Sequence, residues 1–227
     1  MAHSINTDVY AALSYLSKNL ENEKIKKAAS NIQQIRDLTN LIMWYLKRDK
    51  LQLSGSIQLV SIEEVIKAQI ETIKAGIHTL RLTTSHHRDK IINMSVNIDK
   101  DGPCTIEIDK DLVNAIDLIF KDVLRNALKN TDENEPNVSI KITDNDKNVS
   151  VKISNNILIP AYELNWFNKG LETDELIMSK SSKVGLRLVK KWSQYLQIYN
   201  RLTVDEIKKE TTFHLTIPKE VNIEKTA

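Results

Sequence analysis

The stretch from Asp117 to Thr131 carries three polar side chains at helical spacing whose chemistry suits a magnesium–phosphate ligand. Apolar residues recur every three or four positions between Ile116 and Ala127, which predicts a helix with one buried face. Asp122, Asn126 and Lys129 lie four and three residues apart, so they share a second face beside the apolar one. An amide oxygen is a hard ligand for Mg²⁺, and an ammonium group attracts phosphate. Taken alone, the same stretch also fits an ordinary amphipathic helix with a solvated polar side.

The letters NALKNT within this stretch resemble the N-box of the histidine kinase ATP-binding domain, a member of the GHKL ATPase superfamily. The resemblance implies ATP and Mg²⁺ as cofactors. It assigns metal binding to Asn126 and phosphate contact to Lys129, and it places Asn130 in the same nucleotide site. Asp122 stands where some members of the superfamily carry an acidic residue that activates water.

Two alternating segments at 138–143 and 149–154 follow, joined by a polar turn, and they predict a β-hairpin. The next letters, NNILIP, stand where the resembled family has an Asp-x-Gly-x-Gly loop. In that family the Asp accepts the adenine amine, and the glycines let the backbone approach the nucleotide closely. Here Asn155 replaces the Asp, and Ile157 and Ile159 replace the glycines. The amide oxygen of Asn155 still accepts a hydrogen bond, without the charge that strengthens it.

Further boxes of the same family follow in order. The letters LNWFNKG resemble the F-box, and 171–183 would form the flexible lid over ATP. The letters SSKVGLRLVKKW resemble the G2 box, which opens a helix whose amino end faces phosphate. Gly185 and Leu186 match that box, Lys183 replaces its first glycine, and Ser182 and Lys183 still carry donors for phosphate. The letters ETTFHLTIP resemble the closing strand of the domain.

Residues 1–54 predict two helices joined by a short turn, because apolar residues recur at helical spacing on both sides of Asn22. One such hairpin has too small a core to stand alone. Two hairpins related by a twofold axis would form a four-helix bundle, so we expect a homodimer. The alternative is that the hairpin packs on the second domain of its own chain.

The opening letters HSINT resemble the H-box of histidine kinases. The resemblance implies that His3 accepts the phosphoryl group and that Thr7 is the threonine four residues further on. A neutral imidazole nitrogen is a nucleophile near neutral pH, which suits that role. Ser4 and Asp8 depart from the acidic residue and the proline of the family. An ordinary histidine near the chain start is the alternative interpretation.

A strand at 57–60, an N-cap at Ser61 and a helix to about residue 75 open the second domain. The expected fold class is α+β. An antiparallel helical hairpin at 1–54 precedes a GHKL-type α/β sandwich at 57–219, and 220–227 form a tail. The order of the boxes along the chain is the specific part of the resemblance.

Composition narrows the partners. The formal net charge is +2, which implies neither a nucleic acid nor an anionic membrane as partner. The single cysteine, Cys104, excludes an intrachain disulfide and a cysteine metal site and is typical of a reducing cytoplasm. No apolar run reaches the ~20 residues of a membrane helix. We therefore expect a cytoplasmic protein that makes no membrane contact through this chain.

The resemblance implies a two-component histidine kinase core. It would bind Mg–ATP, pass the γ-phosphoryl group to His3 and then to an aspartate in the receiver domain of a response regulator. The altered glycine positions leave two alternatives open. The chain would be a histidine phosphotransferase or pseudokinase whose ATP domain is a scaffold, or a GHKL regulator that binds a partner without phosphorylating histidine.

Overall fold

The computed structural model of the chain describes residues 55–75, 95–132, 134–169 and 184–221. The helical hairpin expected at 1–54, with His3 and Thr7, lies outside the described residues. The expected lid at 171–183, with Ser182 and Lys183, lies outside them as well. Apart from Ala75, the described residues belong to one compact unit, which comprises 53–74 and the chain from 90 onward.

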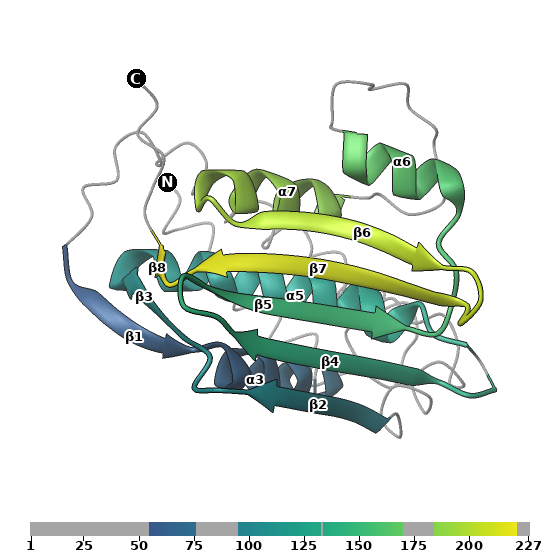
Figure 1. Cartoon of the computed structure of the whole chain (residues 1–227), viewed down its shortest axis with the longest axis horizontal. Helices are drawn as coiled ribbons and strands as arrows, with labels where there is room; N and C mark the ends of the chain where they lie inside the picture. The colour runs from purple at the N-terminus through teal and green to yellow at the C-terminus, as the bar shows by residue number, and fades with distance from the viewer. Residues whose placement is uncertain (1–54, 76–94, 133, 170–183, 222–227) are drawn as a thin grey trace, which may run out of the picture. The chain divides into compact units, whose positions relative to one another are not determined.

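A five-stranded sheet forms the centre of this unit (Figure 1). In spatial order its strands are β2 (Ser95–Asp101), β4 (Asn137–Asp144), β5 (Asn148–Asn155), β7 (Glu210–Pro218) and β6 (Tyr199–Asp205). The β2–β4 pair is parallel, and the other three pairs are antiparallel. The hairpin predicted from the alternating pattern is therefore β4–β5, and each strand extends one residue beyond both of its predicted ends.

A second, smaller sheet contains β1 (Ile57–Ser61), β3 (Thr105–Asp109) and β8 (Glu220–Val221). β1 pairs with β3 in antiparallel fashion, and β3 pairs with β8 in parallel. The sequence analysis assigned 220–227 to a tail, but Glu220 and Val221 continue the structure as β8. The reason is burial, because the Val221 side chain is only 4% exposed beside Ile108.

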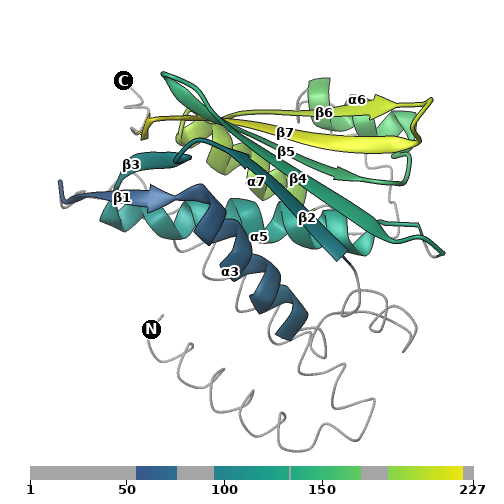
Figure 2. The same ribbon diagram turned by 60° about the horizontal axis from the view of Figure 1, so that its bottom comes forward.

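Three helices, α3 (Ile62–Ala75), α5 (Val113–Lys129) and α7 (Val184–Tyr195), lie on one face of the five-stranded sheet (Figure 2). A 3₁₀ turn, Lys110–Leu112, leads into α5, and α6 (Ala161–Lys169) lies beside strand β6. No described element covers the opposite face of the sheet. None of the described helices combines the length and apolar composition needed to span a bilayer.

The core lies between α5 and the sheet. The apolar positions of α5 that the sequence pattern predicts are all buried: Ile116, Ile119, Phe120, Val123, Leu124 and Ala127. They meet the side chains that alternate inward from β4, β5 and β7, which are Val138, Ile140, Ile142, Val149, Val151, Ile153, Phe213, Leu215 and Ile217. Each large side chain buried in this way contributes roughly 1.5–3 kcal/mol relative to exposure. The helix that carries the candidate site is thus held by most of the core.

Helix α6 is attached to the edge of the sheet by one side chain. The amide nitrogen of Asn168 donates to the carbonyl of Leu202 at 2.8 Å, and the Leu202 N–H donates to Asn168 Oδ1 at 3.0 Å. The neighbouring Phe167 packs edge-to-face on Phe213, with ring centroids 5.2 Å apart. Asn168 therefore occupies one backbone donor and one acceptor of the edge strand β6.

The turn between β2 and β3 depends on Gly102, which has a φ of +83°. A Cβ at this position would lie 2.5 Å from Cβ of Asp144. Asp144 accepts a hydrogen bond from the Cys104 N–H at 3.1 Å and forms an ion pair with Lys219. The Lys219 ammonium holds the pKa of the Asp144 carboxyl below its usual value. The turn, the end of β4 and the residue before β8 therefore meet at Asp144.

We predict that Gly102→Ala lowers the free energy of unfolding more than Gly55→Ala does. Both glycines have positive φ, so each alanine costs about 1–2 kcal/mol for its backbone conformation. Only Gly102→Ala adds a steric clash, which costs about 1–3 kcal/mol more. Gly55 is the matched control because no described atom lies within 4 Å of a methyl group placed there. Urea unfolding curves measure the difference, and equal losses for the two variants would contradict the clash with Asp144.

Candidate functional site

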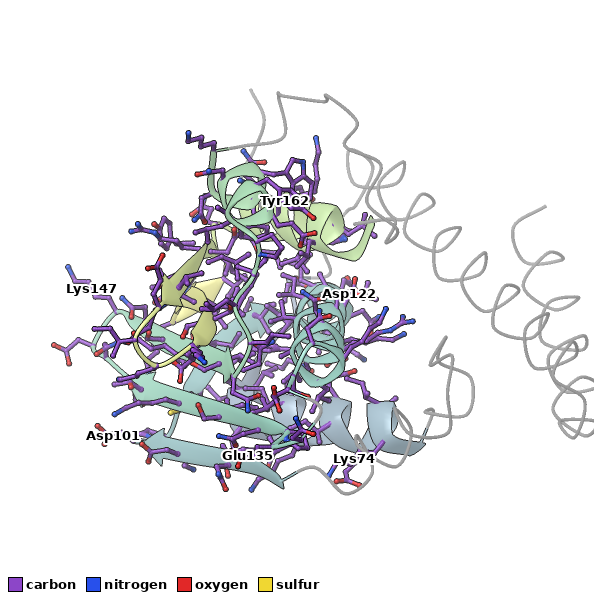
Figure 3. All side chains as sticks on the ribbon, turned by 90° about the vertical axis from the view of Figure 1, so that its right-hand side faces the viewer. Lys74, Asp101, Asp122, Glu135, Lys147 and Tyr162 are labelled. Carbon is purple, nitrogen blue, oxygen red and sulfur yellow. The ribbon has the colours of Figure 1, made fainter. Side chains whose placement is uncertain are left out.

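Helix α5 positions the three polar side chains that the sequence analysis singled out. Asp122 and Asn126 are half-buried and Lys129 is exposed, beside the fully buried apolar face. This gradient follows from helical periodicity, because positions next to the apolar stripe lie at its margin. Figure 3 shows Asp122 on α5. The expected shared face of Asp122, Asn126 and Lys129 is therefore placed along the margin of the core.

The first turn of α7 comes close to Asp122. A methyl group added at Gly185 would lie 3.3 Å from both Cγ and Oδ2 of the Asp122 carboxylate. Gly185 is the second residue of α7, so the carboxylate lies beside the amino end of that helix, where a negative charge is stabilised. The absence of a side chain at Gly185 is what permits this approach. Asp122 and Gly185, which are far apart in the sequence, therefore meet in the structure.

Asn126 and Asn130 also form a pair. The Asn130 amide nitrogen donates to Asn126 Oδ1 at 2.8 Å and to the Asn126 backbone carbonyl at 3.0 Å. The backbone N–H of Asn130 donates to the same carbonyl at 3.0 Å. These bonds fix which way the Asn126 amide oxygen faces. That oxygen has two lone pairs and retains one for a cation.

Asn155 ends strand β5 beneath α5. Its side-chain nitrogen donates to the carbonyl of Ala127 at 3.4 Å, and the residue is 9% exposed. Its Oδ1 is buried and has no hydrogen-bond partner among the described residues. A buried acceptor without a partner costs about 1–3 kcal/mol. Such an atom would gain a hydrogen bond from a ligand donor, once the atoms that cover it move aside.

The loop after β5 is fixed by a residue that the sequence analysis did not single out. The Thr211 hydroxyl donates to the carbonyl of Ile157 at 2.6 Å and accepts from the Ile159 N–H at 2.9 Å. No residue of this loop has a positive φ. Isoleucine therefore fits the backbone conformation found here. Thr211 belongs to the letters TTF that resemble the closing strand of the family, but nothing in the sequence indicated that it would bond to Ile157 and Ile159.

Asn156 connects the same loop to the segment after α5. Its Oδ1 accepts from the Asp132 N–H at 3.1 Å, and its nitrogen donates to the carbonyl of Glu135 at 2.5 Å. Asp132 in turn accepts from the N–H groups of Asn134 and Glu135 at 2.8 and 3.0 Å. The segment that follows Asn126 and Asn130 is therefore held in place from β5.

Lys190 is a second residue that sequence reasoning missed. Its ammonium donates to the carbonyl of Phe167 and lies 5.2 Å from the centre of the Phe167 ring. Burial lowers the pKa of Lys190. The contact joins α7 to α6. Its role is to hold the helix that carries Gly185, and no pattern in the sequence pointed to it.

The arrangement fits a Mg²⁺-bound nucleotide. Asn155 supplies a buried acceptor, Asn126 an oriented amide oxygen, and Lys129 an exposed ammonium group, all at or near the carboxyl half of α5. Leu186, half-buried, follows Gly185 on α7. Within the described ranges no cluster of three or more His, Cys, Asp or Glu side chains would hold a metal ion by itself. Magnesium would therefore be shared between Asn126 and the phosphate oxygens of the ligand.

Comparison with known proteins supports the ATPase-domain fold expected from the sequence. Residues 111–221 match the family described as histidine kinase-, DNA gyrase B-, and HSP90-like ATPase. No curated protein sequence matches the chain. The match confirms the GHKL ATPase domain that the N-box resemblance implied.

Three solved structures have the same fold. The catalytic domain of histidine kinase ThkA has a TM-score of 0.54 and 17% identity, and the match covers 74% of this chain and 99% of ThkA. The mycobacterial sensor histidine kinase MprB has a TM-score of 0.53 and 17% identity, and the match covers 74% of this chain and 100% of the MprB chain. The Acinetobacter baumannii histidine kinase AdeS has a TM-score of 0.57 and 14% identity, and the match covers 96% of this chain and 96% of the AdeS chain. The described unit therefore has the fold of a histidine kinase catalytic domain.

We predict that Thr211→Val loosens the loop at 157–159. The substitution keeps the shape of the side chain but leaves the Ile159 N–H and the Ile157 carbonyl without their partner, which costs about 1–3 kcal/mol. Hydrogen exchange at the Ile159 amide should accelerate, and the midpoint of urea unfolding should fall. Thr216→Val is the matched control, since Thr216 lies on the same strand with its hydroxyl outside any hydrogen bond to a described residue. Unchanged exchange at Ile159 would show that Thr211 does not hold the loop.

Proposed function

We propose that this chain is the catalytic core of a histidine kinase. Its ATPase domain binds Mg–ATP, the γ-phosphoryl group passes to His3, and from His3 it passes to an aspartate in the receiver domain of a response regulator. Two chains assemble through residues 1–54 in this proposal. The observation that carries it is the buried, unpartnered Oδ1 of Asn155 beneath the helix that bears Asn126 and Lys129.

Asn155 favours adenine as the base. Its nitrogen is bonded to the Ala127 carbonyl, so its oxygen is the atom left for a ligand. The exocyclic amine of adenine donates a hydrogen bond to such an oxygen. Guanine carries a carbonyl at that position, and two acceptors would then face each other. Turning the Asn155 amide over would place its oxygen against the Ala127 carbonyl instead, so the residue cannot easily adapt to guanine.

The residues of α5 and α7 would serve mainly to position phosphates. Asn126 is held by Asn130 and would bind Mg²⁺, which neutralises phosphate charge when it is bound. Lys129 is exposed and reaches solvent, where it would attract the terminal phosphates. Asp122 lies against Gly185 and would orient a water molecule or a metal-bound ligand beside the amino end of α7. These roles need geometry and charge and involve no covalent step on the ATPase domain.

A second function is favoured by a different observation. Ile157 and Leu158 are 42% and 40% exposed in the loop where the resembled family has glycines. Thr211 bonds to the backbone of this loop at Ile157 and Ile159, so the backbone that carries these side chains is held in place. If they exclude nucleotide, the chain is a histidine phosphotransferase or pseudokinase. It would then relay phosphate through His3 without using ATP.

We predict that the purified chain binds a non-hydrolysable Mg–ATP analogue in the micromolar range by isothermal titration calorimetry. Asn126→Ala should weaken binding about tenfold to 100-fold, because a hydrogen-bonding or metal-binding group near a charge is worth about 1.5–3 kcal/mol. The GTP analogue should bind at least about tenfold more weakly than the ATP analogue, since the buried Asn155 oxygen stays unpaired.

Asn137→Ala is the matched control for this titration, because Asn137 is an exposed asparagine at the start of β4, outside the site. It should bind as the unmodified chain does. Absence of heat together with absence of nucleotide-dependent thermal stabilisation would contradict ATP binding. That outcome would favour the phosphotransferase or pseudokinase. Equal affinity for ATP and GTP analogues would contradict the role given to Asn155.

We predict that the phosphate acquired by the chain is labile to acid and stable to base, and that His3→Ala abolishes it. Phosphorus bonded to an imidazole nitrogen has this behaviour, unlike phosphate on serine or threonine. The measurement is incubation with radiolabelled ATP and, separately, with a phosphorylated receiver domain. His86→Ala and His87→Ala serve as controls. Labelling that persists in His3→Ala would remove His3 from the proposed relay.

A further inference from the structure

The open face of the five-stranded sheet carries its polar side chains in ordered rows. Strand pairing places Lys141 opposite Lys152, Lys152 opposite His214, and His214 opposite Arg201. These four residues, which we call the basic row, cross β4, β5, β7 and β6 at right angles to the strands. Their strand neighbours point into the core, so the basic row faces away from α3, α5 and α7.

The charges of the basic row are poorly compensated. Lys141 has one partner, Asp99, at 3.8 Å, and both side chains are largely exposed, so this pair is weak. Lys152 and Arg201 are exposed and form no ion pair with a described carboxylate. The row does not reflect a general excess of positive charge, because the chain has 32 Lys and Arg against 30 Asp and Glu.

Such a row opposes the stability of the sheet. Like charges on directly opposite positions of neighbouring strands repel each other. Burial lowers the pKa of His214, and the positive charges of Lys152 and Arg201 lower it further because they disfavour the protonated imidazole. Its Nε2 lies 2.7 Å from the Thr203 hydroxyl, so the ring is held within the row. Folding alone therefore does not favour Lys141 directly opposite Lys152.

Two rows of polar side chains, mostly hydroxyls, run on either side of the basic row. The first contains Asn97, Ser139, Ser154, Thr212 and Thr203, and the second contains Asp101, Thr143, Ser150, Thr216 and Tyr199. Residues two apart on one strand are separated by about 6.8 Å, so the three rows span about 14 Å. An α-helix with its side chains is about 10–12 Å wide, so it would cover the basic row and reach both hydroxyl rows.

The spacing along the basic row also fits a helix. Neighbouring strands lie about 4.8 Å apart, which sets the separation of adjacent basic residues. Side chains three or four residues apart on a helix are separated by about 5–6 Å. Carboxylates repeated at that interval along one face of a helix would meet the basic residues in turn. The hydroxyls of Thr143, Ser150 and Thr216 on one side would donate to the same carboxylates. On the other side, Ser154, Thr212 and Thr203 already form hydrogen bonds within the sheet.

Other anionic partners fit this face less well. Single-stranded nucleic acid binds on aromatic side chains that stack on bases, and Tyr199 is the one aromatic residue among the described residues of the three rows. A basic membrane-binding surface typically has four to eight Lys or Arg residues, whereas the basic row has three and a histidine whose pKa is lowered.

We propose that the open face of the sheet is a docking surface for an acidic α-helix of a partner protein, which lies across the strands along the basic row. This surface is on the opposite side of the sheet from α5 and α7. It is therefore separate from the proposed nucleotide site, and its existence does not depend on whether that site binds ATP.

The test uses the full chain and a fluorescein-labelled, alanine-rich helical peptide with glutamate at every third or fourth position. The reference probe is the same peptide with glutamine in place of glutamate. Fluorescence anisotropy at low and high salt gives the affinities. The test variant is the double substitution Lys152→Glu and Arg201→Glu. The matched control is Lys147→Glu and Lys208→Glu, which makes the same change of charge in two exposed turns of the same sheet.

We expect the glutamate peptide to bind with an affinity that falls with salt, and the glutamine peptide not to bind. The test variant should weaken binding by about tenfold or more, and the control by less than about twofold. Lys152→Gln should not lower the midpoint of urea unfolding, since it relieves repulsion, and it should still weaken peptide binding. This variant keeps the test valid if the double substitution fails to fold.

Three outcomes would overturn the proposal. Equal binding of the two peptides would show that carboxylates are not recognised. Equal losses in the test variant and the control would show attraction by overall charge, without a docking surface. Binding of oligo(dT), or of vesicles containing phosphatidylserine, in place of the glutamate peptide would assign the face to nucleic acid or to membrane.

Discussion

The packing of α5 against the five-stranded sheet is the constraint on which the rest of the unit depends. One helix supplies a large share of the buried apolar side chains and, on the margin of that same face, Asp122 and Asn126. The rotation of α5 about its axis is set by its buried residues, so the polar residues cannot shift without disturbing the core. Gly185 and Asn155 then meet α5 from α7 and β5. The candidate site therefore takes its precision from hydrophobic burial.

Local patterns in the sequence predicted the elements of this arrangement well. The periodicity around Val123 predicted α5, alternation predicted β4 and β5, and Ser61 caps α3 through the Glu64 N–H at 3.4 Å. Relations between distant residues were not predictable in the same way. The parallel pairing of β2 with β4 and the bonds of Thr211 join segments with no shared pattern. Glu220 and Val221 were missed because a two-residue strand has no periodicity. The predictions for His3, Thr7, Ser182 and Lys183 concern residues outside the described ranges.

Glycine has two effects on a loop, and the loop at 157–159 shows that only one of them is missing here. Glycine permits positive φ, and it also leaves room for a ligand close to the backbone. No positive φ occurs in this loop, so isoleucine is compatible with its conformation. What the substitutions remove is space, because Ile157 and Ile159 carry side chains where glycine has none, and Ile157 is exposed. The change therefore bears on the access of a ligand and leaves the folding of the loop intact. The Thr211 hydroxyl helps to keep the loop folded by bonding to the backbone of Ile157 and Ile159.

The bond pair between Asn168 and Leu202 has a consequence for how the protein behaves at high concentration. An edge strand with unpaired N–H and C=O groups is a template onto which another chain can add a strand. Asn168 occupies one donor and one acceptor of β6, and α6 lies beside that edge. The side-chain amide of Asn168 therefore obstructs edge-to-edge pairing of β6 with a strand of another molecule. Loss of this amide would therefore be expected to appear as self-association of the chain.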